Sequence, residues 1–166
     1  MILSNATPLI YLAKIGKLDL LRSLYKEVSI PEEVYKEVVK GKEDKFFDAL
    51  IIDKSIKDGW IKIKKVKVKK EIESFASEID LGEIELISLA TETKPYLILI
   101  DDASARAIAE SFGFNVKGTI YVLLRAYKKK MISKKEVKEF VNKLIIFGFR
   151  ISQEFYVELL DELDKM

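Results

Sequence analysis

The sequence contains no cysteine and no histidine. Without cysteine, the chain has no disulfide, no iron–sulfur cluster, no thiolate zinc site and no cysteine nucleophile. Without histidine, it has no imidazole metal ligand, no histidine general base and no Ser-His-Asp triad. Any catalysis must therefore depend on carboxylates, lysines, hydroxyl groups or a bound metal ion.

The sequence also has little excess charge of one sign, few linker residues and no long apolar run. Lysine and arginine total 29 against 27 acids, so the net charge of +2 does not select nucleic acid or a membrane as partner. With 7 glycines and 3 prolines, the chain has no flexible linker. No apolar run is long enough to span a membrane, and the short stretch at 1–4 lacks the features of a signal peptide. We expect a cytoplasmic protein with no membrane contact.

Apolar residues make up 49% of the 166 residues, which is enough for one folded domain with a real core. Short apolar segments alternate with amphipathic ones. Strands are expected at 1–4, 27–30, 60–68, 96–100 and 115–117. Helices are expected from Thr7-Pro8 to Gly16, at 17–25, 31–39, 43–57, 81–92 and 102–112, from Gly118, at 134–147, and from Ser152. This alternation predicts a three-layer α/β fold with a central parallel sheet of about five strands flanked by helices.

Acidic residues fall where such a sheet would gather them at one edge. Asp101 and Asp102 directly follow the apolar segment YLILI at 96–100, and adjacent carboxylates there repel each other unless a cation or a base neutralises them. The other candidates at this edge are Asn5, Glu37 and Glu83. Each position alone has an ordinary alternative, as a helix cap, a first-turn charge or an exposed helix residue. Together they supply the oxygen ligands that Mg²⁺ or Mn²⁺ takes.

Several short motifs occur in a fixed order along the chain. They are NATPLI at 5–10, IPEEVYKEV at 30–38, DLGE at 80–83 with Ile87 and Ala90, and IDDASAR at 100–106 followed by Gly118-Thr119. In order and spacing they resemble PIN-domain proteins, most of all the prokaryotic branch similar to VapC-type toxin ribonucleases. The resemblance covers about residues 1–130, so we expect a PIN-like domain there and a helical extension at 131–166 packed on the same domain.

The resemblance implies a reaction and a set of site residues. PIN nucleases cleave RNA with Mg²⁺ or Mn²⁺ held by clustered acids. By position, the first acid falls on Asn5, the second on Glu37, the third on Glu83 and the fourth on Asp101 or Asp102. Of these, the implied metal ligands are Asn5, Glu83, Asp101 and Asp102. Most PIN nucleases carry Asp at the position of Asn5; asparagine keeps one carbonyl ligand and loses the negative charge.

Hydroxyl and basic residues near these motifs are candidate RNA contacts. The candidates are Thr7, Arg106, Thr119, Arg125, Lys128, Lys129 and Lys130. Helix capping is the alternative for both threonines, and pairing with an acid is the alternative for Arg106. A separate run of six lysines at 61–70 fits an edge strand protected from aggregation better than an RNA track.

Two functions remain open from the sequence. The first is a Mg²⁺- or Mn²⁺-dependent endoribonuclease, the toxin of a toxin–antitoxin pair. The second is a non-catalytic PIN-like protein that binds RNA or protein, because Asn5 removes a ligand charge. A receiver-like phosphoacceptor is less favoured, because its acid pair belongs at the end of the first strand. The resemblance also implies a small antitoxin protein as partner and a homodimer, which the apolar helix residues 120–124 and 155–163 would suit.

Overall fold

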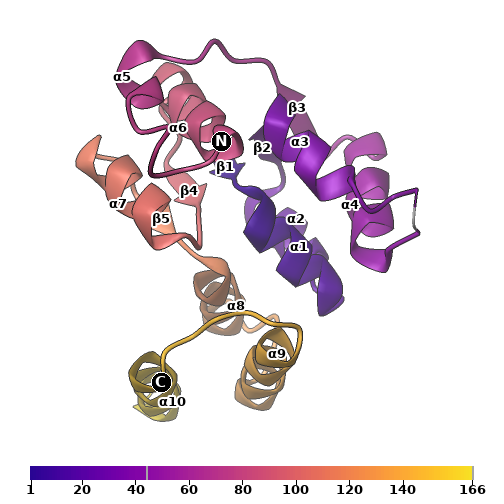
Figure 1. Cartoon of the computed structure of the whole chain (residues 1–166). Helices are drawn as coiled ribbons and strands as arrows, with labels where there is room; N and C mark the ends of the chain where they lie inside the picture. The colour runs from indigo at the N-terminus through magenta and orange to yellow at the C-terminus, as the bar shows by residue number, and fades with distance from the viewer. Residues whose placement is uncertain (44, 166) are drawn as a thin grey trace.

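The computed structural model describes residues 1–43 and 45–165. Its centre is a sheet with helices on both sides (Figure 1). The strands are β1 (Ile2–Ser4), β2 (Val28–Pro31), β3 (Ile61–Lys64), β4 (Leu97–Leu99) and β5 (Val116–Lys117). They form one five-stranded sheet in the order β3-β2-β1-β4-β5, and every pair is parallel. The predicted α/β fold is confirmed.

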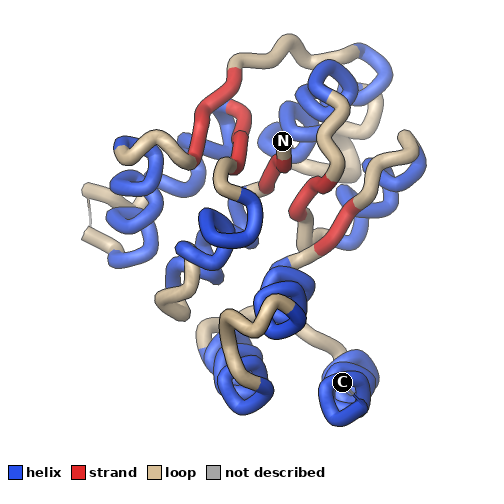
Figure 2. Tube along the Cα trace, turned by 180° about the vertical axis from the view of Figure 1, so that it is seen from behind, coloured by secondary structure: helices blue, strands red, loops and turns tan. Residues whose placement is uncertain are grey.

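Helices precede and follow almost every strand. They are α1 (Ala6–Lys14), α2 (Asp19–Tyr25), α3 (Glu32–Val39), α4 (Phe47–Lys57), α5 (Lys70–Glu73), α6 (Leu81–Thr93), α7 (Ala103–Ser111), α8 (Thr119–Lys128), α9 (Lys134–Ile146) and α10 (Gln153–Lys165). The last three lie together at one end of the sheet (Figure 2). Over the described residues, no helix combines the length and the hydropathy that a membrane crossing requires.

The central strands are buried on both faces, which explains their unbroken apolar sequence. Successive side chains of a strand point to opposite faces. In β4, Leu97 and Leu99 join a core cluster with residues of α1, α2 and α8. Ile98 and the following Ile100 join the second cluster, with residues of α6 and α7. The alternation thereby divides one apolar segment between two helical layers.

The C-terminal helices share the core of the sheet. Residues of α9 and α10 lie in the same apolar cluster as Ile2 and Leu99: Val137, Phe140, Val141, Leu144, Leu159 and Leu163. The segment 131–165 is thus packed against the rest of the fold, while residue 166 lies outside the described residues. The boundary at 130 between domain and extension stays a prediction.

The start of α1 differs from the prediction. We expected Thr7 as the cap and Pro8 as the first helical residue, but Asn5 occupies the cap position with extended backbone angles (φ −76°, ψ 173°), and the helix begins at Ala6. Pro8 is tolerated inside this first turn because the first four backbone N–H groups of a helix have no acceptor within it. Asn5 is therefore held between β1 and α1.

Two other boundaries also differ. The strand predicted at 60–68 is only Ile61–Lys64, because its partner β2 is four residues long and each pairs with one residue of β3. Helix α4 begins at Phe47 rather than at 43, and residue 44 lies outside the described residues. β3 is an edge strand, as predicted for the lysine run at 61–70, but only Lys62 and Lys64 of the six lysines lie in it.

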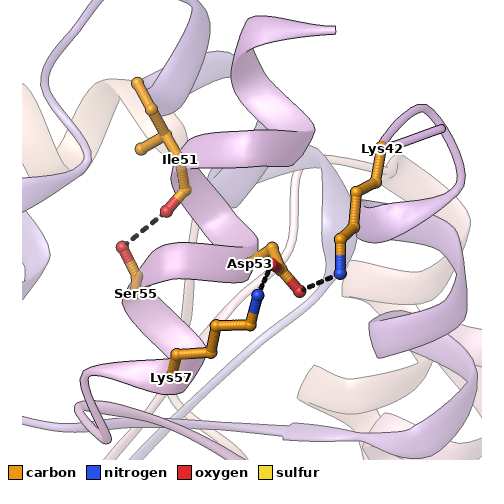
Figure 3. A network of polar contacts seen from close by, with 5 residues as sticks. All are labelled: Lys42, Ile51, Asp53, Ser55 and Lys57. Atoms are coloured by element: carbon orange, nitrogen blue, oxygen red, sulfur yellow. Dashed lines mark hydrogen bonds and ion pairs between the residues drawn. The ribbon is translucent and has the colours of Figure 1, made fainter. Parts of the chain in front are cut away.

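A polar network holds α4 to the segment after α3 (Figure 3). Both carboxylate oxygens of Asp53 bind lysines: Lys42 Nζ lies 3.0 Å from Oδ1 and Lys57 Nζ lies 2.7 Å from Oδ2. Asp53 is buried, whereas the two lysines reach into solvent. In the same helix, the Ser55 hydroxyl donates to the carbonyl of Ile51, one turn earlier.

Replacing Asp53 by alanine should lower the free energy of unfolding by about 1 kcal/mol, because both partners are solvated lysines. The hydrogen bonds from Lys57 and Lys42 lower the pKa of Asp53 below its ordinary value. The stabilisation is therefore present above that ordinary value and is lost as the pH falls through the lowered one. Urea unfolding at pH 7 and at low pH measures this; an equal loss at both would contradict the ion-pair account.

Candidate functional site

The strand order reverses at the carboxyl ends of β1 and β4. From β1 the chain continues to β2 on one side of β1, while β4 pairs on its other side. Ligands of open parallel sheets bind at such a reversal of strand order. Asn5 follows β1 here, and its backbone N–H donates to the Leu99 carbonyl at 2.9 Å. Asp101 and Asp102 follow β4 after one residue, Ile100, so they lie at the predicted edge.

Asn5 and Glu83 meet at this edge although 78 residues separate them in sequence. The Asn5 Nδ2 donates to Glu83 Oε1 at 3.1 Å. Both side chains are buried, with only 4% and 5% of their surface exposed. Among the described residues, nothing donates a hydrogen bond to the buried Oδ1 of Asn5. A buried acceptor without a hydrogen bond lowers the free energy of unfolding, and a cation bound to this oxygen would remove that cost.

Glu83 is also the third residue of α6, where it forms a capping box with the cap residue Asp80. Its backbone N–H donates to Asp80 Oδ1 at 2.9 Å, and the Asp80 N–H donates to Glu83 Oε2 at 3.1 Å. In the sequence, this capping box is indicated by the pattern D-x-x-E at 80–83, which was not among our predictions. Both Glu83 oxygens are therefore held in place, one by Asn5 and one by the backbone of Asp80.

Negative charge accumulates around Glu83. Burial, and then repulsion from the nearby carboxylates of Asp80, Asp102 and Glu37, together raise the pKa of Glu83 to about 7, against the opposing backbone hydrogen bond from Asp80. Burial, followed by repulsion from Asp80, also raises the pKa of Glu37. Glu37 and Asp80 line one cleft of about 380 Å³ between α3 and the start of α6. Four acids therefore share one electrostatic environment.

The two adjacent aspartates have different surroundings. Asp101 accepts from the Thr119 N–H at 2.8 Å and from the Thr119 hydroxyl at 2.6 Å, and it lies near the Arg106 guanidinium. Its pKa is nevertheless raised, because burial outweighs these contacts. Asp102 caps α7 by accepting from the Ala105 N–H at 2.9 Å. Of the pair, Asp102 is the one whose charge acts on Glu83.

A family model described as PIN domain matches residues 1–165. The chain belongs to the PIN-domain family. The match reaches beyond the 1–130 segment that carries the motifs, so both C-terminal helices fall within it. No curated protein matches the chain. The PIN domain is a nuclease-type fold, and the candidate site lies where the sequence motifs are.

The predicted RNA contacts of the PIN domain lie in two places. Thr7 sits in the first turn of α1, half-buried, and Thr119 is fully buried against Asp101. Arg106 donates to the Ile100 carbonyl at 3.0 Å. The remaining candidates are exposed at the end of α8 and just beyond it: Arg125, Lys128, Lys129 and Lys130. Neither contact is the alternative considered from the sequence: Thr119 follows the cap Gly118 and binds Asp101, and Arg106 binds a backbone carbonyl rather than an acid.

The donors at the PIN-domain edge suit a hard cation in their chemistry. They are oxygens, and one of them, Asn5 Oδ1, lacks a hydrogen-bond donor across the described residues. In the part of the chain that the structure describes, however, no three acids lie close enough together to hold a metal ion. Asn5 accounts for part of this, because an amide stands where an acid of the cluster is expected. Glu83, Asp102 and Asn5 are the residues best placed to hold Mg²⁺ or Mn²⁺.

The raised pKa of Glu83 makes the stability of the PIN domain depend on pH. Between its ordinary value of 4.5 and about 7, the folded state holds a proton that the unfolded state releases. The stabilisation is complete below 4.5 and is lost as the pH rises through 7. We expect the free energy of unfolding to fall over this range in the wild type and to fall less in Glu83→Gln, as measured by urea unfolding. Identical pH slopes would contradict this assignment.

Proposed function

We propose that this PIN domain is a Mg²⁺- or Mn²⁺-dependent endoribonuclease that hydrolyses phosphodiester bonds in RNA, similar to VapC-type toxins. The observation that carries the proposal is the Asn5–Glu83 pair at the carboxyl edge of the sheet. It combines an oxygen to which none of the described residues donates a hydrogen bond with a carboxylate that burial and three nearby acids disfavour in its charged form. A divalent cation would relieve both costs at once.

Each residue of the proposed site has its own role. Glu83 and Asp102 supply negative charge, and Asn5 supplies a neutral carbonyl oxygen. A bound ion would polarise the phosphate and lower the pKa of the attacking water. Without an ion, the same acids repel the RNA backbone, so substrate binding at this edge depends on the metal. Asp101 keeps the start of α8 beside the site through Thr119.

Partners and compartment belong to the same proposal. A toxin would be inhibited by a small antitoxin protein, and it would act in the cytoplasm, where RNA is available. Apolar side chains at the end of α9 and on α10 reach solvent, among them Ile146 at 79% and Val157 at 50% exposed. Exposed apolar side chains are typical of protein contacts when they form a patch, and we propose a homodimer through these residues.

A second function is favoured by one residue. Asn5 stands where most PIN nucleases carry an acid, and the loss of one charge weakens the attraction for a divalent ion. On this account the chain is a non-catalytic PIN protein that binds RNA or another protein. The fold would be unchanged, because Asn5 keeps its backbone hydrogen bond to Leu99.

Cleavage of a mixed RNA pool with Mn²⁺ distinguishes the two functions. We expect the wild type to cleave, and Asn5→Asp to cleave roughly 10-fold faster because a carboxylate binds the ion better than an amide. Removing the metal with EDTA should abolish both activities. Cleavage by Asn5→Asp alone would favour the binding function, and no cleavage by either would contradict the nuclease.

A further inference from the structure

A cleft opens beside Asp101, between α8 and the segment that joins α9 to α10. Its volume is about 420 Å³, within the range of roughly 300–1,000 Å³ of small-molecule pockets. Its wall includes the rings of Tyr121, Phe149 and Phe155. The Phe149 ring is fixed by an edge-to-face contact with Tyr11, with the ring centroids 5.1 Å apart, whereas Phe155 is 45% exposed.

The cleft carries uncompensated positive charge. Three cations and one acid line it: Arg106, Lys117, Arg150 and Asp101. Arg106 lies beside Asp101, so these two opposite charges offset each other. Within residues 1–43 and 45–165, no ion pair joins Lys117 or Arg150 to an acid. The Lys117 ammonium lies 5.8 Å from the centroid of the Tyr121 ring, so charge and ring face the same space.

We propose that this cleft binds one nucleotide of a single-stranded RNA, with its base on the exposed ring of Phe155 and its phosphate between Lys117 and Arg150. The inference rests on the proposed function, since it takes RNA as the substrate. Aromatic rings stack on any base, and lysine and arginine bind phosphate. Because Asp101 lines the cleft and Asp102 follows it, the next phosphate of the strand reaches the acid site.

The surface of α8 extends this cleft as a basic strip. Residues three or four apart share one face of a helix, so Tyr121, Arg125 and Lys128 lie in line. Arg125 and Lys128 are exposed, and no ion pair to either is found in the part of the chain that the structure describes. The phosphates of the adjoining nucleotides would lie along this strip and bind Arg125 and Lys128, two of the predicted RNA contacts.

Binding of a fluorescent single-stranded RNA hexamer in EDTA tests the cleft without any cleavage. We expect Phe155→Ala to bind about ten-fold more weakly, from the lost stacking. Arg150→Ala should lower the salt dependence by about one counterion, from the lost phosphate contact. Phe47→Ala and Arg22→Ala are matched controls, exposed and on other helices, and should bind like the wild type. Unchanged binding in both cleft variants would overturn the inference.

A second measurement uses the wild type alone. A hexamer with 4-thiouridine should crosslink to the peptides that contain Tyr121, Phe149 or Phe155; crosslinks confined to other peptides would overturn the inference. A poly-glutamate peptide that binds as tightly as RNA, with the same loss in Phe155→Ala, would also overturn it, in favour of an acidic protein partner. Binding that depends on Phe155 in a wild type that never cleaves would support the cleft and refute the nuclease.

Discussion

Replacing Glu83 by alanine should reduce metal-dependent RNA cleavage at least 100-fold. Glu83 is the buried carboxylate that Asn5 and the backbone of Asp80 hold in place, so its loss removes both a ligand charge and the partner of Asn5. Removing a charged ligand exceeds the roughly 10–100-fold effect of residues that only support ligands. Initial rates with Mn²⁺ on the RNA pool measure the change.

Two further variants separate this loss from unfolding. Glu83→Gln keeps a side chain that can complete the capping box, so α6 should remain folded while cleavage still falls. Glu92→Ala removes an exposed glutamate from the same helix and should cleave like the wild type. Cleavage by Glu83→Ala at the wild-type rate would place the reaction elsewhere on the surface.

Replacing Gly118 by alanine should lower the free energy of unfolding by about 2 kcal/mol, the usual size of an overpacking penalty. A Cβ at Gly118 would lie 2.5 Å from Asp101 Oδ1 and 2.9 Å from Arg106 Nη2. The backbone angle of Gly118 (φ −110°) suits any residue, so the penalty comes from space alone. Asp101 would have to move away from Thr119, whose two hydrogen bonds it accepts.

Thermal unfolding should show this as a decrease in Tm of roughly 4–8 °C for a chain of this size. Gly82→Ala is a suitable control, because the nearest atoms to its Cβ would be the Asp80 carboxylate at 3.3 Å and Val34 at 3.4 Å. Its effect should be smaller than that of Gly118→Ala, because a contact at 3.3 Å is relieved by a far smaller movement than one at 2.5 Å. Equal stability of the two variants would mean that the packing around Asp101 is not tight.

The sheet was largely predictable because its strands are short, apolar and bounded by helix signals. The helices expected at 134–147 and 81–92 agree with α9 and α6, and each begins with a capping box in the structure, Ser133 with Glu136 and Asp80 with Glu83. The length of β3 was overestimated because apolar and polar residues continue to alternate past Lys64, whereas its partner β2 ends at Pro31. Strand length depends on a neighbour distant in sequence, which local pattern does not report.

The candidate site was predictable as a set of positions but not as a set of contacts. The motifs brought Asn5 and Glu83 into consideration, yet nothing local indicates that the Asn5 amide donates to Glu83. The motifs could not separate Asp101 from Asp102, because the distinction depends on Thr119 of α8. The aromatic cleft was missed because Phe149 and Phe155 meet Tyr121 only after the last helices pack.

The central position of β1 has a consequence during synthesis. β1 pairs with β2 on one side, but its other side pairs with β4, and Ile2 meets Leu97 there. A ribosome makes about 5–20 residues per second, so β1 has an open edge for roughly 5–20 s before its second partner exists. The edge of the sheet beside Asn5 is complete only when β4 has paired with β1. A nascent chain thus carries an incomplete site while it is still bound to the ribosome.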